Sequence, residues 1–271
     1  WSLAFVLGIP LAGFLIARGG WMAPFRLFAL LGLLSMLALF ISLPTDRHEE
    51  RSNIGLVKNF SSVFTYAPAM IALSVGLFAS TANEIVNVIF GVWLDDSLKT
   101  WVGPQGFEGV FKFLNYFKDT LGLDIALLIL AAIVIGISEL SAEGMVARFV
   151  DKLGKPRAVA LGLLLNSLSA LLLPILGKTT SGALIGLSMF YISFEFALVS
   201  LIPMMTEIMP ATRATLMAFN VAALSLGRAA GALLAPYLYA SGLFASGIGA
   251  VFFNILSLFF LAKFIKQEGH A

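Results

Sequence analysis

The chain has 271 residues, of which 59% are hydrophobic and 12% charged, and its mean hydropathy is +0.97. Soluble domains carry about 25% charged residues, so this composition excludes a soluble protein and indicates an integral membrane protein. The formal charge of +2 gives no reason to expect a nucleic-acid partner, and the absence of Cys excludes disulfides, thiol catalysis and thiolate metal sites. Both histidines, His48 and His270, fall in polar segments, so we expect no metal site, no cofactor and no catalytic residue.

Apolar segments long enough to cross a bilayer recur along the chain and predict an all-α, polytopic transmembrane helical bundle. The chain opens at Trp1 inside an apolar run, without an initiator Met, so we expect an N-terminally truncated fragment. A polar segment at 45–62 is expected to be a loop with a short surface helix. Eight spans are predicted, the first of them present only as a remnant at 3–17; the others are 21–43, 67–92, 124–149, 158–176, 183–207, 214–239 and 243–263.

The piece from Asp95 to Leu123 is too polar to span a bilayer. Large apolar residues recur in it at helical spacing, with charged and amide residues between them, which predicts an amphipathic helix near 107–121 lying in the membrane interface. The alternative is a helix that packs on neighbouring loops. The apolar residues are Phe107, Val110, Phe111, Leu114, Phe117 and Leu121.

The span at 124–149 carries two carboxylates, Glu139 and Glu143, which lie four residues apart and therefore on one face of a helix. A charge at the bilayer centre costs about 2.5–3.5 kcal/mol on insertion scales, so we expect both to face protein or a wet cavity. Arg228, deep in the span at 214–239, is the expected counter-charge. One interpretation is an ion pair that joins two helices through Glu139 and Arg228, and the other is a coupled proton relay.

A short, mostly basic turn from Asp151 to Arg157 follows this span. A carboxylate in a tight loop can lie against a helix N-terminus, where the dipole favours an anion by about 0.3–1 kcal/mol, so the turn is interpreted as a conformational latch. A plain solvated turn is the alternative. Glu207 and Arg213, from another turn, could join this cluster. The residues of the predicted latch are Asp151, Lys152, Gly154 and Arg157.

Two further spans carry polar residues that could contribute to a substrate or proton pathway. Glu84, with Asn83 and Asn87, lies in the span at 67–92, where a carboxylate could accept a proton or bind a cationic substrate. Glu195 lies near the middle of the span at 183–207. Each carboxylate could instead be satisfied by a neighbouring helix. Aromatic residues around Glu195 could form a wall of the pathway or face lipid and core; they are Phe190, Tyr191, Phe194 and Phe196.

The distribution of basic residues predicts the orientation, because loops rich in Lys and Arg stay in the cytoplasm. With the loop at 45–62 inside, ten of the 17 basic residues fall on the cytoplasmic side, six outside and one in the membrane. The C-terminus is then cytoplasmic.

Three stretches resemble the major facilitator superfamily, and within it the drug:proton antiporter-like branch. Gly8-Ile-Pro10-Leu-Ala-Gly13 is similar to the Gly-Pro-Gly motif of that family's fifth helix. The stretch Ala147 to Arg157 is similar to its short basic loop motif between helices eight and nine. Gly227-Arg228-Ala-Ala-Gly231 fits the small-residue eleventh helix. The glycines of these stretches are expected to pack closely against other helices, and Pro10 to kink its own.

The resemblance implies that the chain runs from about helix five to helix twelve of a twelve-helix fold. Residues 1–44 would then be the last two helices of the N-terminal half, 45–66 the central cytoplasmic loop, and 67–271 the C-terminal six-helix half. It also implies a secondary active transporter that works by alternating access, with a small-molecule substrate near the midplane. The expected partners are the substrate, membrane lipid, a coupling proton and the missing N-terminal helices of the same protein.

Proton-coupled efflux of small organic molecules from a prokaryotic plasma membrane is the function that we expect. An uncoupled or differently coupled metabolite carrier, and a non-transporting membrane receptor or scaffold, are the alternatives. A membrane-embedded enzyme would need a nucleophile and base, or metal ligands, converging within the bilayer, and no such pattern is visible in the sequence.

Overall fold

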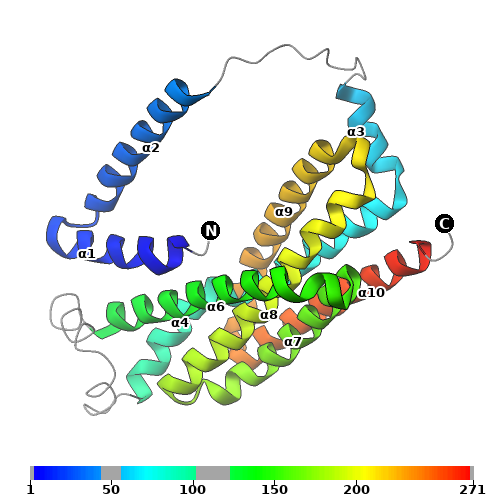
Figure 1. Ribbon diagram of the computed structural model, residues 1–271. Helices are drawn as coiled ribbons and strands as arrows, with labels where there is room; N and C mark the ends of the chain where they lie inside the picture. The colour runs from blue at the N-terminus through cyan, green and yellow to red at the C-terminus, as the bar shows by residue number, and fades with distance from the viewer. Residues whose placement is uncertain (1–2, 44–55, 102–122, 269–271) are drawn as a thin grey trace.

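The computed structural model describes residues 3–43, 56–101 and 123–268, and every element of secondary structure in these ranges is helical (Figure 1). Helices are expected in lipid because each satisfies its backbone hydrogen bonds within its own segment. The elements are η1 (Ala4–Gly8), α1 (Ile9–Gly19), α2 (Ala23–Ser42), α3 (Leu56–Thr65), α4 (Ala67–Trp101), α6 (Leu123–Leu153), α7 (Lys155–Leu176), α8 (Thr180–Ile208), η2 (Pro210–Thr212), α9 (Arg213–Ala240) and α10 (Leu243–Glu268).

Seven helices of the described ranges are long and apolar enough to cross a membrane, which confirms seven of the eight predicted spans. The remnant of a span predicted at 3–17 is apolar and helical but too short to cross a bilayer. Its α-helix, α1, has 11 residues and rises about 17 Å, against a hydrocarbon core of about 30 Å.

Pro10 lies in the first turn of α1, directly after the π-helical turn η1. The wider π turn leaves room for the proline ring, which would clash with a carbonyl of a regular preceding helix.

The helix predicted at 67–92 is longer than expected. α4 has 35 residues and a length of about 52 Å, so it exceeds the apolar core and carries Asp95 and Asp96 within the helix. The predicted interfacial helix near 107–121 lies outside the described residues.

The seven-residue turn predicted from Asp151 to Arg157 is wrong. α6 continues to Leu153, and α7 begins at Lys155, so the chain reverses at Gly154 alone. Gly154 has φ +82°, a left-handed conformation that glycine adopts at little cost, and its N–H donates to Val150 O at 2.9 Å. Pro156 falls in the first turn of α7, where its missing N–H has no helical partner to lose.

The helices α4, α6, α7, α8, α9 and α10 form one bundle with an internal repeat. α4 packs on α9 and α10, whereas α8 packs on α6 and α7; α7 also contacts α10, and α4 contacts α8. The first three helices correspond to the last three: α4 to α8, α6 to α9 and α7 to α10. When each helix is replaced by its counterpart, every one of these contacts becomes another contact that the bundle contains. Because three crossings reverse the direction of the chain, the second triplet is inverted relative to the first, as in inverted-repeat transporters.

The first two helices lie outside this bundle. η1 and α1 pack on α6, where a Cβ added to Gly13 would lie 2.9 Å from Ile129 Cδ1. Gly8, by contrast, faces no other helix closely, since a Cβ there would meet only Ala4 of the same segment. α2 packs on α1 and stands apart from the bundle (Figure 1), and none of its apolar window is buried.

Candidate functional site

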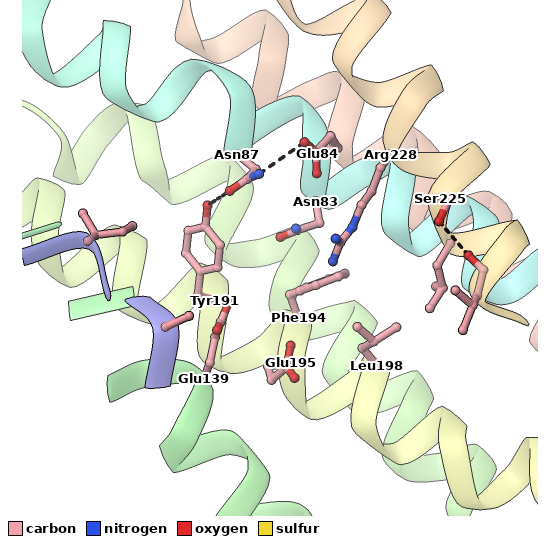
Figure 2. A pocket seen from close by; sticks show the side chains of 14 residues that line it. Asn83, Glu84, Asn87, Glu139, Tyr191, Phe194, Glu195, Leu198, Ser225 and Arg228 are labelled. Atoms are coloured by element: carbon pink, nitrogen blue, oxygen red, sulfur yellow. Dashed lines mark hydrogen bonds between the residues drawn. The ribbon is translucent and has the colours of Figure 1, made fainter. Parts of the chain in front are cut away.

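A cavity of about 650 Å³ lies among α4, α6, α8 and α9, with η1 and α1 at its edge (Figure 2). Its wall combines carboxyl, amide, hydroxyl and guanidinium groups with aromatic and aliphatic side chains. The lining residues are Ala4, Ile9, Asn83, Glu84, Asn87, Glu139, Tyr191, Phe194, Glu195, Leu198, Val221, Leu224, Ser225 and Arg228.

Two helices line the cavity with the same spacing. α8 contributes residues 191, 194, 195 and 198, and α9 contributes residues 221, 224, 225 and 228. Both sets follow the i, i+3, i+4, i+7 pattern, which places four side chains on one face of a helix. The cavity therefore lies along one face of α8 and one face of α9, which have the same spacing of lining residues. The two helices are not counterparts of each other in the internal repeat.

Within the described part of the chain, three carboxyl groups and one guanidinium line the cavity, from four different helices. Glu84 comes from α4, Glu139 from α6, Glu195 from α8 and Arg228 from α9. Glu139 is buried, with 5% of its surface exposed, whereas Glu84, Glu195 and Arg228 are half-buried. Glu195 is within electrostatic reach of Glu139, Glu143 and Arg228. Figure 2 shows Arg228 extending from α9 into the cavity.

A short chain of hydrogen bonds ties α8 to α4 at one side of the cavity (Figure 2). The hydroxyl of Tyr191 donates to Asn87 Oδ1 at 2.8 Å, and Asn87 Nδ2 donates to Glu84 Oε1 at 3.2 Å. Asn87 is thus oriented by partners on both sides, because its acceptor and its donor are both engaged. This arrangement fixes the position of the Glu84 carboxyl relative to Tyr191.

Glycines on α9 position Arg228. A Cβ added to Gly231 would lie 2.7 Å from both Thr81 O and Glu84 Cβ, and one added to Gly227 would collide with Leu77 O. These residues therefore let the backbone of α9 approach α4 closely, and Ser80 Oγ donates to Leu224 O across the contact at 3.0 Å. The close contact places the polar stripe of α9 directly beside that of α4.

The structure brings together all five residues predicted for the substrate or proton pathway. Asn83, Glu84, Asn87, Tyr191 and Glu195 all line the cavity. Of the charge network predicted from the sequence, Glu139 and Arg228 also line it, whereas Glu143 is half-buried one turn further along α6 and does not.

The predicted aromatic wall divides into two parts. Tyr191 and Phe194 line the cavity. Phe190 and Phe196 are instead buried in separate hydrophobic clusters of the bundle. The sequence analysis missed Leu198, Val221, Leu224 and Ser225, although the spacing that they share with Arg228 and Glu195 was a usable signal.

The residues of the predicted latch lie away from the cavity, where α6 ends and α7 begins. Asp151, Lys152 and Arg157 are exposed. Lys155 forms an ion pair with Glu207 at the end of α8, so the two predicted turns do meet, through a lysine of the first and a glutamate of the second. In the second turn Arg213 Nε donates to Thr206 O at 3.2 Å.

A bundle of membrane-spanning helices around a polar cavity, built from an inverted pair of helix triplets, defines a polytopic membrane protein of the transporter class. Residues 1–192 match the sequence model of the Major Facilitator Superfamily, and the chain belongs to this family. It is accordingly an integral membrane protein and a secondary transporter rather than an enzyme. No match is found among curated proteins.

Proposed function

We propose that the protein couples the efflux of small organic molecules to proton entry by alternating access. The observation that supports this proposal best is the convergence of Glu84, Glu139 and Glu195 on one cavity together with Arg228. The cavity volume of about 650 Å³ falls within the range of about 300–1,000 Å³ typical of small-molecule sites. Its aromatic and aliphatic side chains add apolar contact area for an organic substrate.

Coupling requires that a proton and the substrate compete for the same groups. Glu84 and Glu195 face the cavity from α4 and α8, the two helices that occupy equivalent positions in the internal repeat. A carboxylate can hold either a cationic substrate or a proton, and protonation removes its attraction for the cation. Binding of a proton would then release the substrate, and the difference in affinity between the two states would drive the exchange.

The test uses the full-length protein in proteoliposomes, with ethidium, a planar aromatic cation, as the probe. We expect ethidium movement driven by a pH gradient to fall about tenfold or more in Glu84→Gln and Glu195→Gln, because neither amide can exchange a proton. Ethidium exchange without a gradient should persist in at least one variant. Asp96→Asn is the matched control, since Asp96 lies on α4 but outside the cavity, and it should transport normally.

An unchanged response to the pH gradient in both variants would remove these carboxyls from the coupling mechanism. Ethidium transport by the unmodified protein that does not respond to a pH gradient would favour the uncoupled carrier instead. Complete absence of transport for ethidium and for neutral probes would favour a receptor or scaffold.

We also propose that residues 67–271 form one six-helix half, that residues 1–44 belong to the other half, and that the C-terminus lies in the cytoplasm of a prokaryotic cell. The supporting observation is the excess of basic residues in the loops on the side of the C-terminus. A fluorescent-protein fusion to Ala271 should fluoresce and an alkaline phosphatase fusion should be inactive; the opposite pair of results would reverse the topology.

A further inference from the structure

A second cavity lies on the outside of the bundle, between α6, α7 and α8. It is a groove of about 360 Å³ lined almost entirely by apolar side chains, several of which are about 40% exposed, and it shares no residue with the polar cavity. The lining residues are Met145, Phe149, Leu153, Leu161, Leu165, Ser169, Met189, Ile192, Ser193 and Phe196.

The few polar groups of this groove are already satisfied. Ser169 Oγ donates to Leu165 O at 2.8 Å, and Ser193 Oγ donates to Met189 O at 2.7 Å, so each hydroxyl bonds to its own helix. The groove therefore offers an occupant almost nothing but apolar contact. An occupant that fits this surface is a hydrocarbon chain.

Three basic residues stand at one end of the groove. Arg157 lies one turn before Leu161 on the groove face of α7, and Lys152 lies three residues after Phe149 on α6. The Arg148 guanidinium carbon is 6.0 Å from the centre of the Phe149 ring, which itself lines the groove. All three are exposed.

The acidic groups near this end do not cancel the positive charge. Asp151 lies on the opposite face of α6 from the residues that line the groove. Glu207 is engaged by Lys155. An anionic group is therefore attracted to the end of the groove, as polybasic segments attract anionic lipids at a membrane surface.

The dimensions of the groove match one leaflet. From Arg157 to Ser169, α7 rises about 18 Å, close to half of a hydrocarbon core of about 30 Å. We propose that the groove binds an anionic phospholipid, with one acyl chain along α7 between α6 and α8 and the headgroup phosphate on Arg148, Lys152 and Arg157. This site is independent of the substrate cavity and of the proposed transport.

The experiment is a native mass spectrometry titration of the full-length protein in detergent, with dioleoyl phosphatidylglycerol or dioleoyl phosphatidylcholine. We expect the phosphatidylglycerol to bind about tenfold more tightly. The variant K152Q/R157Q should lose about twentyfold in affinity for phosphatidylglycerol while its affinity for phosphatidylcholine stays the same. The variant L165W should weaken binding of both lipids, because the indole fills the groove.

The matched control is K263Q/K266Q, which removes two exposed basic residues from the end of α10. These residues lie at the same end of the bundle as the basic residues of the groove. It should keep the preference for phosphatidylglycerol. Equal affinity for both lipids in the unmodified protein, a preference that survives in K152Q/R157Q, or a preference lost equally in the control would each overturn the proposal. Unchanged lipid binding in L165W, or occupation of the groove by a second copy of the chain, would do the same.

Discussion

Gly231 lies where α9 packs directly against α4, beside Glu84. A side chain there would meet the Thr81 carbonyl and the Glu84 Cβ at 2.7 Å, and both atoms belong to α4. Backbone and Cβ atoms cannot move out of the way as the end of a long side chain can. The position therefore couples helix packing to the placement of a cavity carboxyl.

We expect Gly231→Ala to destabilise the protein by about 1–3 kcal/mol, the usual cost of overpacking. It should also weaken gradient-driven ethidium transport, because α4 would shift at Glu84. Gly144→Ala is the matched control: Gly144 lies within α6, and a Cβ there meets nothing within 4 Å. Thermal unfolding in detergent measures the stability of the two variants. Equal midpoints for the two variants would contradict the assigned contact.

The charged residues of the site could be predicted from the sequence, whereas its apolar wall could not. A carboxyl such as Glu195 in a membrane span is costly unless it meets protein or water, so its presence alone points inward. Leu198 and Val221 carry no such signal by themselves, because a leucine or valine facing a cavity looks the same in sequence as one facing lipid. They can be placed only through their helical spacing from Glu195 and Arg228, once those residues are known to face a cavity.

The helices α7 and α10 are joined by a buried amide pair. Asn254 Nδ2 donates to Asn166 Oδ1 at 2.8 Å, and Asn166 Nδ2 donates to the Phe190 carbonyl of α8 at 2.8 Å. Asn166 thus connects three helices. It lies in the contact between α7 and α10, which are counterparts in the internal repeat. Neither residue lines the polar cavity, and their hydrogen bonds join α7 to α10 and to α8.

A double-mutant cycle tests this pair. The coupling free energy between Asn166→Leu and Asn254→Leu should be about 0.6–1.7 kcal/mol, which spans the average and the largest value found in such cycles on membrane helices. Asn166→Leu alone should cost more than Asn254→Leu, because it also leaves the Phe190 carbonyl without this donor. Ser141→Ala is the control, since its hydroxyl bonds to Ile137 of its own helix. Additive effects in mixed-micelle unfolding would show that the bond contributes nothing.

Helix boundaries were predicted less well than helix existence. The polar run from Asp151 to Arg157 looked like a loop, yet hydrogen bonding carries α6 through Leu153, and one left-handed glycine reverses the chain. Polarity marks where a helix leaves the lipid, not where it ends. The same reasoning explains α4, which continues past its apolar part through Asp95 and Asp96.

At the scale of the whole molecule, the internal repeat explains why the site lies where it does. α4 and α8 are equivalent in the repeat and contact each other, so the residues on their facing stripes come from related positions of two inverted triplets. The sequence predicted the number of helices in this bundle, but their pairing depends on contacts between segments more than a hundred residues apart, such as that of Ser80 with Leu224.

The absence of Cys from the sequence allows this architecture to be probed with single cysteines. Cys replacing Ser225 or Leu198 would face the polar cavity, whereas Cys replacing Leu168 or Ile255 would lie at an exposed position on the outside of the bundle, where we expect lipid. A charged thiol reagent needs both water and a thiolate, so we expect the cavity positions to react on the order of tenfold faster in intact membranes. Ethidium should slow the reaction at Ser225→Cys and leave Ile255→Cys unchanged. Fast labelling at Leu168→Cys and Ile255→Cys would mean that water reaches the outer faces of α7 and α10, and the bundle described above would not be the one that spans the membrane.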